Sequence, residues 1–384
     1  MQHFYFDHNA TTPIVPEVLE TAVSCLGQVY GNASSIHHFG QAAKQKLEAA
    51  RRQIAALIHA SPAEVVFTSG GTEADNLAIL GVVRAAGRPN AHLITSAIEH
   101  SAVLASSGQL EREGVAVTRL PVGANGAVNP EDIRRALRPE TVLVTIMHAN
   151  NELGTVQPIA EIARIAHDAG VPMHVDGVQA LGKIAVDVDA LGVDLYSMSG
   201  HKLYAPKGVG ALYVRKGTRI APIAFGGHHE RDRRPGTENV PGIAAFGAAA
   251  ELAGRTLAAE SERLAALRDR LETGVLGRIS STGVNGARWN RTPNTSNIYF
   301  DGVDGEAMVI ALDLRGFAVS TGSACSSGAI MPSHVLTAIG LSADRARSSL
   351  RFSLGRSNDA EQVDALVDAL EASVTHLRRI SVHA

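Results

Sequence analysis

Cysteine and aromatic residues are scarce in this chain of 384 residues. Its two cysteines, Cys25 and Cys325, lie far apart in the sequence, which excludes a disulfide framework and indicates a reducing compartment. The net charge of −3 lacks the bias of proteins that bind nucleic acids or membranes. There is no run of about 18 apolar residues and no basic, apolar leader before Phe4. We therefore expect a cytoplasmic protein without nucleic-acid or membrane partners.

The chain is long enough for two domains, and its elements alternate. Strand-like and helix-like patterns follow one another, with strands expected at 64–68, 93–95, 115–117, 142–147, 171–175, 193–198 and 208–214, and helices at 72–85, 102–112, 130–137 and 159–169. This alternation predicts an α/β fold with a mostly parallel central sheet and helices on both faces.

The pattern changes after about residue 245. A long helix is expected at 248–276, followed by strands at 296–300, 318–320 and 350–354 and helices at 306–314 and 360–377. These elements predict a smaller α+β domain. We expect residues 15–250 to form the large domain, and residues 1–14 with 251–384 to form the small one.

An acid and a lysine follow two of the predicted buried strands. The run at 171–175 ends at Asp176, and the run at 193–198 leads into Ser199-Gly200-His201-Lys202. Open α/β sheets bind their ligands at such strand ends. Pyridoxal phosphate enzymes need both groups, because the lysine holds the cofactor as a Schiff base and the carboxylate keeps the pyridine nitrogen protonated. The alternative is a surface lysine beyond the end of a strand.

A glycine-rich turn between a predicted strand and helix offers a place for the phosphate. In Ser69-Gly70-Gly71-Thr72-Glu73, the glycines let backbone N–H groups approach an anion, and the helix N-terminus favours negative charge. Thr72 could instead be an ordinary helix cap. Together with Ser199 and His201, a phosphate site is the better interpretation.

Two further polar positions follow predicted strands. His100 could stack on a planar cofactor and act as an acid or base, or it could be a structural histidine. Asn151 could reach a cofactor or substrate oxygen, or it could belong to a turn, for which asparagine is well suited.

Several specific stretches span almost the whole chain. They are YFDHNATTP from Tyr5, GNASSIHHFG from Gly31, FTSGGTEADNLAI from Phe67, IEHSAVL from Ile98, HANNELGTVQPI from His148, HVDGVQALGKI from His174, SGHKLYAPKGVGALYVR from Ser199, RPGTENVPGI from Arg234, STGSACSSG from Ser320 and SSLRFSLGR from Ser348. With these stretches the chain resembles the cysteine desulfurases, fold-type I pyridoxal phosphate enzymes of the class V aminotransferase group. The resemblance is to the branch that supplies sulfur for iron–sulfur cluster or nitrogenase assembly.

The resemblance implies a role for each matching residue. The cofactor-binding residues would be Gly71, Thr72, His100, Asn151, Asp176, Gln179, Ser199, His201, Lys202 and Thr237. Among them, Lys202 would carry pyridoxal 5'-phosphate, Gln179 would bond the phenolic oxygen of the ring, and His100 would stack on it and take part in catalysis. Thr237 would reach the phosphate of the neighbouring subunit, which implies a homodimer. No metal is expected.

The resemblance also implies how the substrate and its sulfur are handled. Asn151 and Arg351 would hold the carboxylate of L-cysteine, with Arg351 as a two-pronged donor. Cys325 would attack the substrate sulfur and become a persulfide, L-alanine would leave, and an acceptor such as an iron–sulfur scaffold protein would take the sulfur. The glycine- and serine-rich flanks of Cys325 suit a mobile loop, whereas Cys25 has apolar neighbours and suits packing.

Two departures and several alternatives remain. Gly177 stands where relatives carry a small side chain, and His228-His229 replaces a Gly-Gln pair; adjacent histidines rarely bind one metal ion. A selenocysteine lyase, an aminotransferase or a kynureninase-like hydrolase would share the fold. A hypothesis from a different functional class is a non-catalytic scaffold protein, and the intact set of Lys202, Asp176 and Cys325 argues against it.

Overall fold

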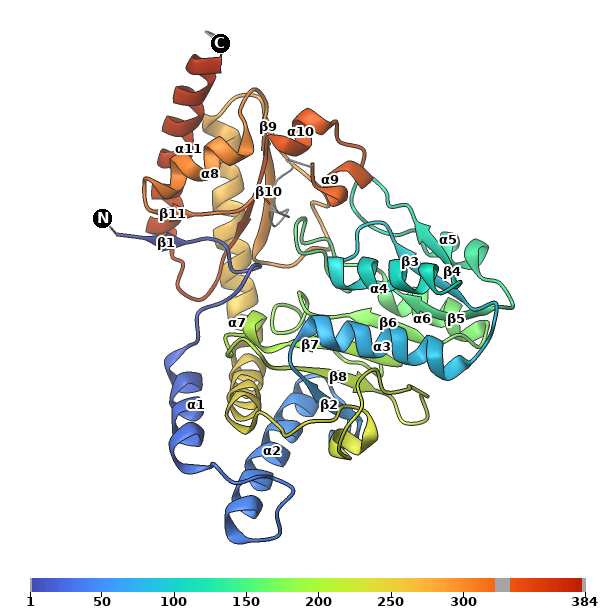
Figure 1. The fold of residues 1–384 in the computed structure, drawn as a ribbon. Helices are drawn as coiled ribbons and strands as arrows, with labels where there is room; N and C mark the ends of the chain where they lie inside the picture. Colours follow the sequence, from blue (N-terminus) through green and yellow to red (C-terminus); the bar gives the residue numbers. More distant parts are fainter. Residues whose placement is uncertain (1, 322–331, 382–384) are drawn as a thin grey trace.

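The computed structural model describes residues 2–321 and 332–381, and its largest sheet has seven strands (Figure 1). In chain order the strands are β2 (Val65–Thr68), β3 (His92–Ser96), β4 (Ala116–Leu120), β5 (Thr141–Thr145), β6 (Met173–Asp176), β7 (Leu195–Ser199) and β8 (Gly210–Val214). In space the order is β2-β8-β7-β6-β5-β3-β4. Within this sheet β8 pairs antiparallel with β2 and β7, and the other described pairs are parallel. The expected mostly parallel sheet is confirmed.

Helices cover both faces of this sheet because successive side chains of a strand point to opposite faces. Leu93 and Leu143 belong to a core under α3 and α4, whereas their neighbours Ile94 and Val144 belong to the core on the other face. The flanking helices are α2 (His38–Leu57), α3 (Gly71–Ala86), α4 (Ser101–Arg112), α5 (Pro130–Ala136) and α6 (Ile159–Asp168). This burial on both faces explains the nearly continuous apolar strands.

A second, smaller unit has its own antiparallel sheet of order β12-β10-β9. Its elements are β9 (Thr282–Val284), β10 (Thr295–Phe300), α8 (Gly305–Asp313), α9 (His334–Ala338), α10 (Ala343–Arg347), β12 (Ser349–Ser353) and α11 (Ala360–Ser381). The N-terminal β1 (Phe4–Tyr5) pairs in parallel with β11 (Phe317–Ala318), and Phe6 enters the core of this unit. Both termini therefore lie on the smaller unit (Figure 1).

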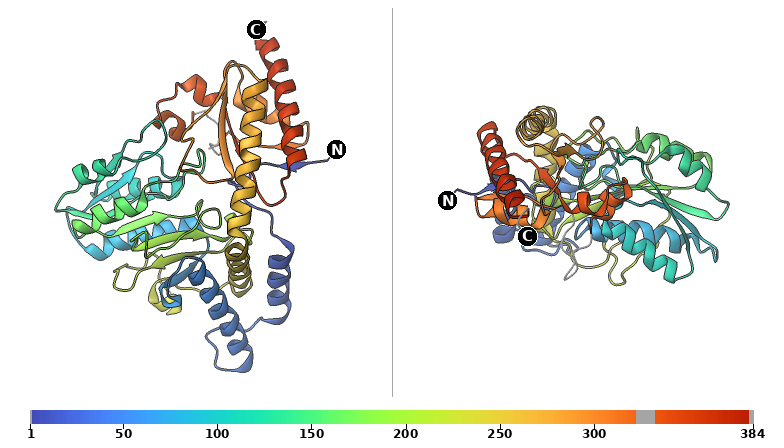
Figure 2. Two further views of the ribbon diagram at one scale, coloured as in Figure 1. Left: turned by 180° about the vertical axis from the view of Figure 1, so that it is seen from behind. Right: turned by 90° about the horizontal axis from the view of Figure 1, so that it is seen from above.

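One helix, α7 (Val240–Arg278), joins the two units. Its 39 residues span about 58 Å at the usual rise per residue. The first half, with Ile243 and Phe246, packs into the core of the large unit, and the second half, with Leu267 and Leu271, packs into that of the small one. Seen from behind, the helix runs from the level of the large sheet into the smaller unit (Figure 2). We propose that the domain boundary near residue 250 falls within this helix.

The structure corrects the sequence-based elements at the N-terminal end. α1 (Pro16–Gln28) and α2 were not predicted. In the case of α1, the exposed Leu19, Val23 and Leu26 leave the helix without a clear polar face. α7 also begins at Val240 rather than at Ala248, with the Asn239 side chain accepting from the N–H of Gly242 as its cap. None of the described helices is sufficiently long and apolar to cross a membrane.

Candidate active site

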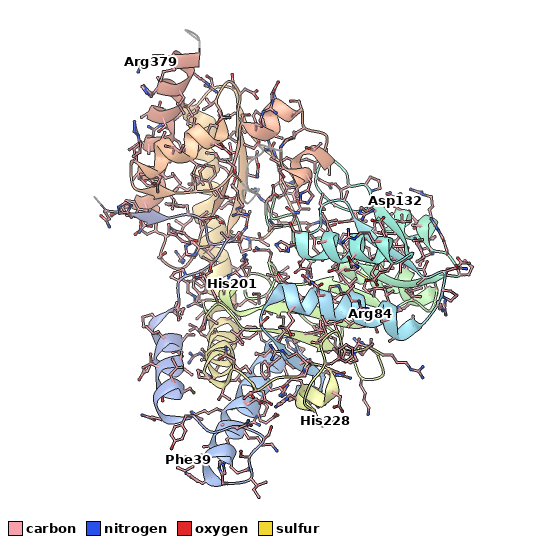
Figure 3. The ribbon with its side chains drawn as sticks, in the orientation of Figure 1. Phe39, Arg84, Asp132, His201, His228 and Arg379 are labelled. Atoms are coloured by element: carbon pink, nitrogen blue, oxygen red, sulfur yellow. The ribbon has the colours of Figure 1, made fainter. Side chains whose placement is uncertain are left out.

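A cavity of about 450 Å³ lies where the carboxyl ends of β6 and β7 meet the smaller unit. It brings together nearly all the residues predicted from the sequence. These are Gly71, Thr72, His100, Asn151, Asp176, Gln179, Ser199, His201, Lys202 and Arg351. Figure 3 shows His201 at the level where the large unit meets the small one. A larger, open depression of about 580 Å³ lies at the opposite strand ends around Thr141 and Pro172, and none of these residues lines it.

Lys202 ends the short 3-10 turn η2 (Gly200–Lys202) that follows β7. Its Nζ donates to the carbonyl oxygens of Asn9 at 2.5 Å and Ala10 at 2.6 Å. Burial, and then the charge of Arg351, lower the pKa of Lys202 to about 8. An amine with this pKa is partly neutral near pH 7 and therefore nucleophilic.

Asp176 is the last residue of β6, and its carboxylate accepts the N–H of Val178 at 3.0 Å. Burial raises the pKa of Asp176, whereas the charge of His100 and the Val178 N–H lower it. One ligand atom each of Asp75, His100 and Asp176 lies within 4.8 Å of the others. Asp75 is fully buried, so burial first and the Asp176 charge second raise its pKa well above the usual value. Burial and the repulsion between the two carboxylates therefore disfavour a negative charge on both at once.

The part of the cavity beside the N-terminus of α3 has a buried hydroxyl without a hydrogen-bond partner. Ser199 Oγ is buried and makes no hydrogen bond. Gly71 opens α3, and a Cβ there would lie 2.7 Å from Val178 Cγ2, so only glycine fits. Burial and the charge of Lys202 lower the pKa of His201 to about 4, which leaves a neutral imidazole. An orphaned hydroxyl beside a helix N-terminus suits a phosphate, so these residues fit pyridoxal phosphate.

Arg351 reaches the cavity from β12 of the small unit. Its Nη2 donates to Asp7 Oδ1 at 2.6 Å and its Nη1 to the Asn151 carbonyl at 3.2 Å. Its Nε is buried without a partner. The guanidinium carries five N–H groups and these bonds use two of them, so it is held in place while further N–H groups stay available for a carboxylate.

One predicted residue is not brought to this cavity, and another lies outside the described part of the chain. Thr237 is exposed and does not line the cavity of its own chain. Cys325 lies outside the described residues, so its predicted role stays a prediction. Ser320 lines the cavity five positions before it, and Ser333, beyond it in the sequence, donates to Glu152 at 2.6 Å.

Sequence reasoning missed several polar residues at or behind the cavity, namely Asp7, Asn9, Asp75, Glu99 and Lys183. Burial raises the pKa of Glu99 to about 8. Asp75 carried a usable signal, since it lies on the buried face of α3 between Ala74 and Leu77. A lone acid on such a face needs an explanation.

The two departures from the family pattern have different outcomes. A Cβ on Gly177 would lie 1.9 Å from Cε1 of Tyr196, so the tyrosine ring fills the place of the missing side chain. Tyr196 is anchored by a 2.9 Å hydrogen bond between its hydroxyl and Nδ1 of His148. His228 lies on the surface with Asp232 and does not line the cavity (Figure 3).

The fold and the cavity define a pyridoxal-phosphate-dependent enzyme of fold type I. The profile of the Aminotransferase class-V family matches residues 4–366. The cysteine desulfurase IscS of Dictyoglomus turgidum is 49% identical over 98% of this chain and 96% of its own. The cysteine desulfurase of Gluconacetobacter diazotrophicus is 45% identical over 99% of this chain and 96% of its own.

Solved structures agree with the sequence comparison. A NifS-like protein superposes with a TM-score of 0.92 at 35% identity, over 98% of this chain and all of the other. The complex of SspA with cysteine gives a TM-score of 0.81 at 38% identity, over 91% and 98% of the two chains. The chain therefore belongs to the class-V aminotransferase family, in its cysteine desulfurase group.

Proposed function

We propose that this chain converts L-cysteine to L-alanine with pyridoxal phosphate and passes the sulfur through Cys325 to an acceptor protein. The observation that carries the proposal is the meeting of Lys202, Asp176 and Arg351 around one cavity. The relatives that bear the name cysteine desulfurase support it.

The residues of the cavity divide the work. When bound, pyridoxal phosphate supplies an electron sink for the negative charge that develops at the substrate Cα. Asp176 would hold the proton of the pyridine nitrogen. Nζ of Lys202, with its lowered pKa, would take the proton from Cα. Arg351, in the cavity wall, would orient the substrate by donating to its carboxylate.

Cys325 would take the sulfur by direct attack. Its thiolate forms a bond to the substrate sulfur while the bond between that sulfur and Cβ breaks. Cysteine and the enzyme thiol become alanine and an enzyme persulfide, so no outside oxidant is needed. We propose an iron–sulfur scaffold protein in the cytoplasm as the acceptor of this sulfur.

We further propose a homodimer in which Thr237 completes the phosphate site of the partner. Its exposure, away from the cavity of its own chain, supports this role. A second support is the apolar surface on and between α1 and α2, where Leu26, Tyr30 and Ile36 are 68%, 72% and 94% exposed. Phe39, half exposed, lies at the far end of these helices (Figure 3). Such a surface is typical of a subunit interface.

Mass spectrometry after incubation with L-cysteine tests the proposal. The loaded enzyme should form alanine, and the peptide that contains Cys325 should gain the mass of one sulfur atom. Pyruvate with free sulfide, or a sulfur adduct on Cys25, would contradict sulfur transfer through Cys325. A parallel incubation with selenocysteine separates a desulfurase from a selenocysteine lyase.

A further inference from the structure

Lys183 is a buried lysine that the proposed reaction does not use. It is 9% exposed, and no carboxylate among the described residues lies within ion-pair distance of its Nζ. Its partners are two amide oxygens, Asn9 Oδ1 at 2.8 Å and Gln179 Oε1. Burial, then the charges of Lys202 and Arg351, lower the pKa of Lys183 well below its ordinary value. A buried amine without an acid is costly, so its partners indicate what it does.

The two amides both line the cofactor cavity, and Lys183 sets their direction. Because Nζ of Lys183 donates to both side-chain oxygens, the amide nitrogens of Asn9 and Gln179 face away from it. Gln179 Nε2 donates to the carbonyl oxygen of Asn9 at 3.0 Å, the same oxygen that accepts from Lys202. Asn9 Nδ2 donates to Thr295 Oγ1 at 2.9 Å and to the Asn151 carbonyl at 3.0 Å. The network leaves the donor end of Gln179 beside Lys202.

We propose that Lys183 is a positioning residue that keeps the amide nitrogen of Gln179 directed at the phenolic oxygen of bound pyridoxal phosphate. This inference rests on the cofactor site of the proposed function. Without Lys183, the amide of Gln179 keeps only the bond from its Nε2 to the Asn9 carbonyl, and its oxygen is no longer held away from a phenolic oxyanion, which it would repel. The charged or titratable groups around Lys183 are His8 of the N-terminal segment, Lys202 of η2 and Arg351 of β12.

A double-mutant cycle with Lys183→Met and Gln179→Ala tests the inference. The first readout is the pH midpoint of the visible absorption change of the loaded protein, and the second is the affinity for pyridoxal phosphate. Lys183→Met should raise the midpoint by about one pH unit and weaken binding about tenfold, the effect expected when a hydrogen bond to a charged oxygen is lost. In the Gln179→Ala background, the same substitution should add no further shift. The exposed Lys216→Met is the matched control and should leave the midpoint unchanged.

Melting of the unloaded protein shows whether Lys183→Met folds, and Gln179→Glu tests separately the donor at position 179 that the inference requires. Glutamate keeps the shape and can pair with Lys183, but it offers only acceptors to the cavity. The midpoint should therefore rise in this variant as well. Equal shifts of Lys183→Met in both backgrounds, or a parental midpoint in Gln179→Glu, would overturn the inference. A parent protein that binds no pyridoxal phosphate would contradict the proposed function instead.

Discussion

The large and the small unit contribute to the cavity in different ways. The large unit supplies side chains at the carboxyl ends of parallel strands, among them Asp176 and Lys202. The small unit supplies Arg351 from within the antiparallel strand β12, with Ser320 bridged to it. The residues that fit the cofactor thus lie mainly in the large unit, whereas Arg351, which would hold the substrate carboxylate together with Asn151 of the large unit, comes from the small unit. Changes in the two units should therefore fail in different ways.

Lys202→Ala in the large unit should have the largest effect. It removes both the covalent holder of the cofactor and the base at Cα, so turnover should fall to background. Borohydride reduction of the parent, followed by peptide mapping, should place the label on Lys202. The internal control is Lys183, which faces Asn9 and Gln179. A label on Lys183 would refute the assignment.

Cys325→Ser should stop sulfur transfer while the cofactor site stays intact. A serine hydroxyl is far less nucleophilic than a thiolate and cannot carry a persulfide. Pyridoxal phosphate and L-cysteine should still bind, and L-cysteine should still change the absorption spectrum.

Cys25→Ser is the control for this variant, because Cys25 is buried in α1 and burial raises the pKa of its thiol. Turnover should be nearly unchanged. If both serine variants lose turnover equally, Cys325 does not have the specific role of sulfur carrier proposed for it.

Arg351→Lys, in the small unit, should have an intermediate effect on turnover. Lysine keeps the charge but loses the fork of donors that suits a carboxylate. The KM for L-cysteine should rise roughly 10- to 100-fold, which corresponds to about 1.4 to 2.8 kcal/mol of binding, whereas the affinity for pyridoxal phosphate should change little. Arg347→Lys, on an exposed neighbour paired with Asp344, is the control. A loss of cofactor in Arg351→Lys with unchanged KM would mean that this arginine holds the cofactor and not the substrate.

How far the site was predictable from the sequence also differs between the units. Strand ends mark Asp176 and Lys202, because a polar residue after an apolar run has a position that the sheet defines. No such pattern marks Arg351, which lies inside a strand and was found through the family resemblance alone. The buried network of Asn9, Gln179 and Lys183 joins residues some 170 positions apart. Local sequence patterns carry no information on contacts of that kind.

The fold shows the same limit. The alternation of strands and helices predicted the large sheet, because period and length are local properties. The exposed apolar face of α1 obscured that helix, since a surface suited to a partner does not show the polar stripe of a free surface. In the small unit the sequence predicted α8 and α11 but missed the short α9 and α10. The crossing of α7 between two cores needed the tertiary structure.

The smallest expected effect concerns the charge that one unit exerts on the other. Only the neutral amine of Lys202 attacks pyridoxal phosphate, so the rate of covalent capture by the unloaded protein should rise with pH through about 8, the lowered pKa of Lys202. Asp7, which holds Arg351, partly opposes this lowering. Asp7→Asn should therefore move the midpoint to lower pH by a fraction of a unit, and stopped-flow measurement of capture against pH would show it.

The free energy of unfolding of the unloaded protein should also rise with pH. Between about pH 8 and the ordinary lysine pKa of about 10.4, the unfolded chain still holds a proton that folded Lys202 has released, so stability gained from this group rises with pH over that window. The remote Asp168→Asn, which breaks a surface pair with Arg164 instead, should leave both profiles unchanged. A capture midpoint near 10.4 in the parent would mean that Lys202 is hydrated like a surface lysine. The cavity between the two units would then not exclude water as its burial requires.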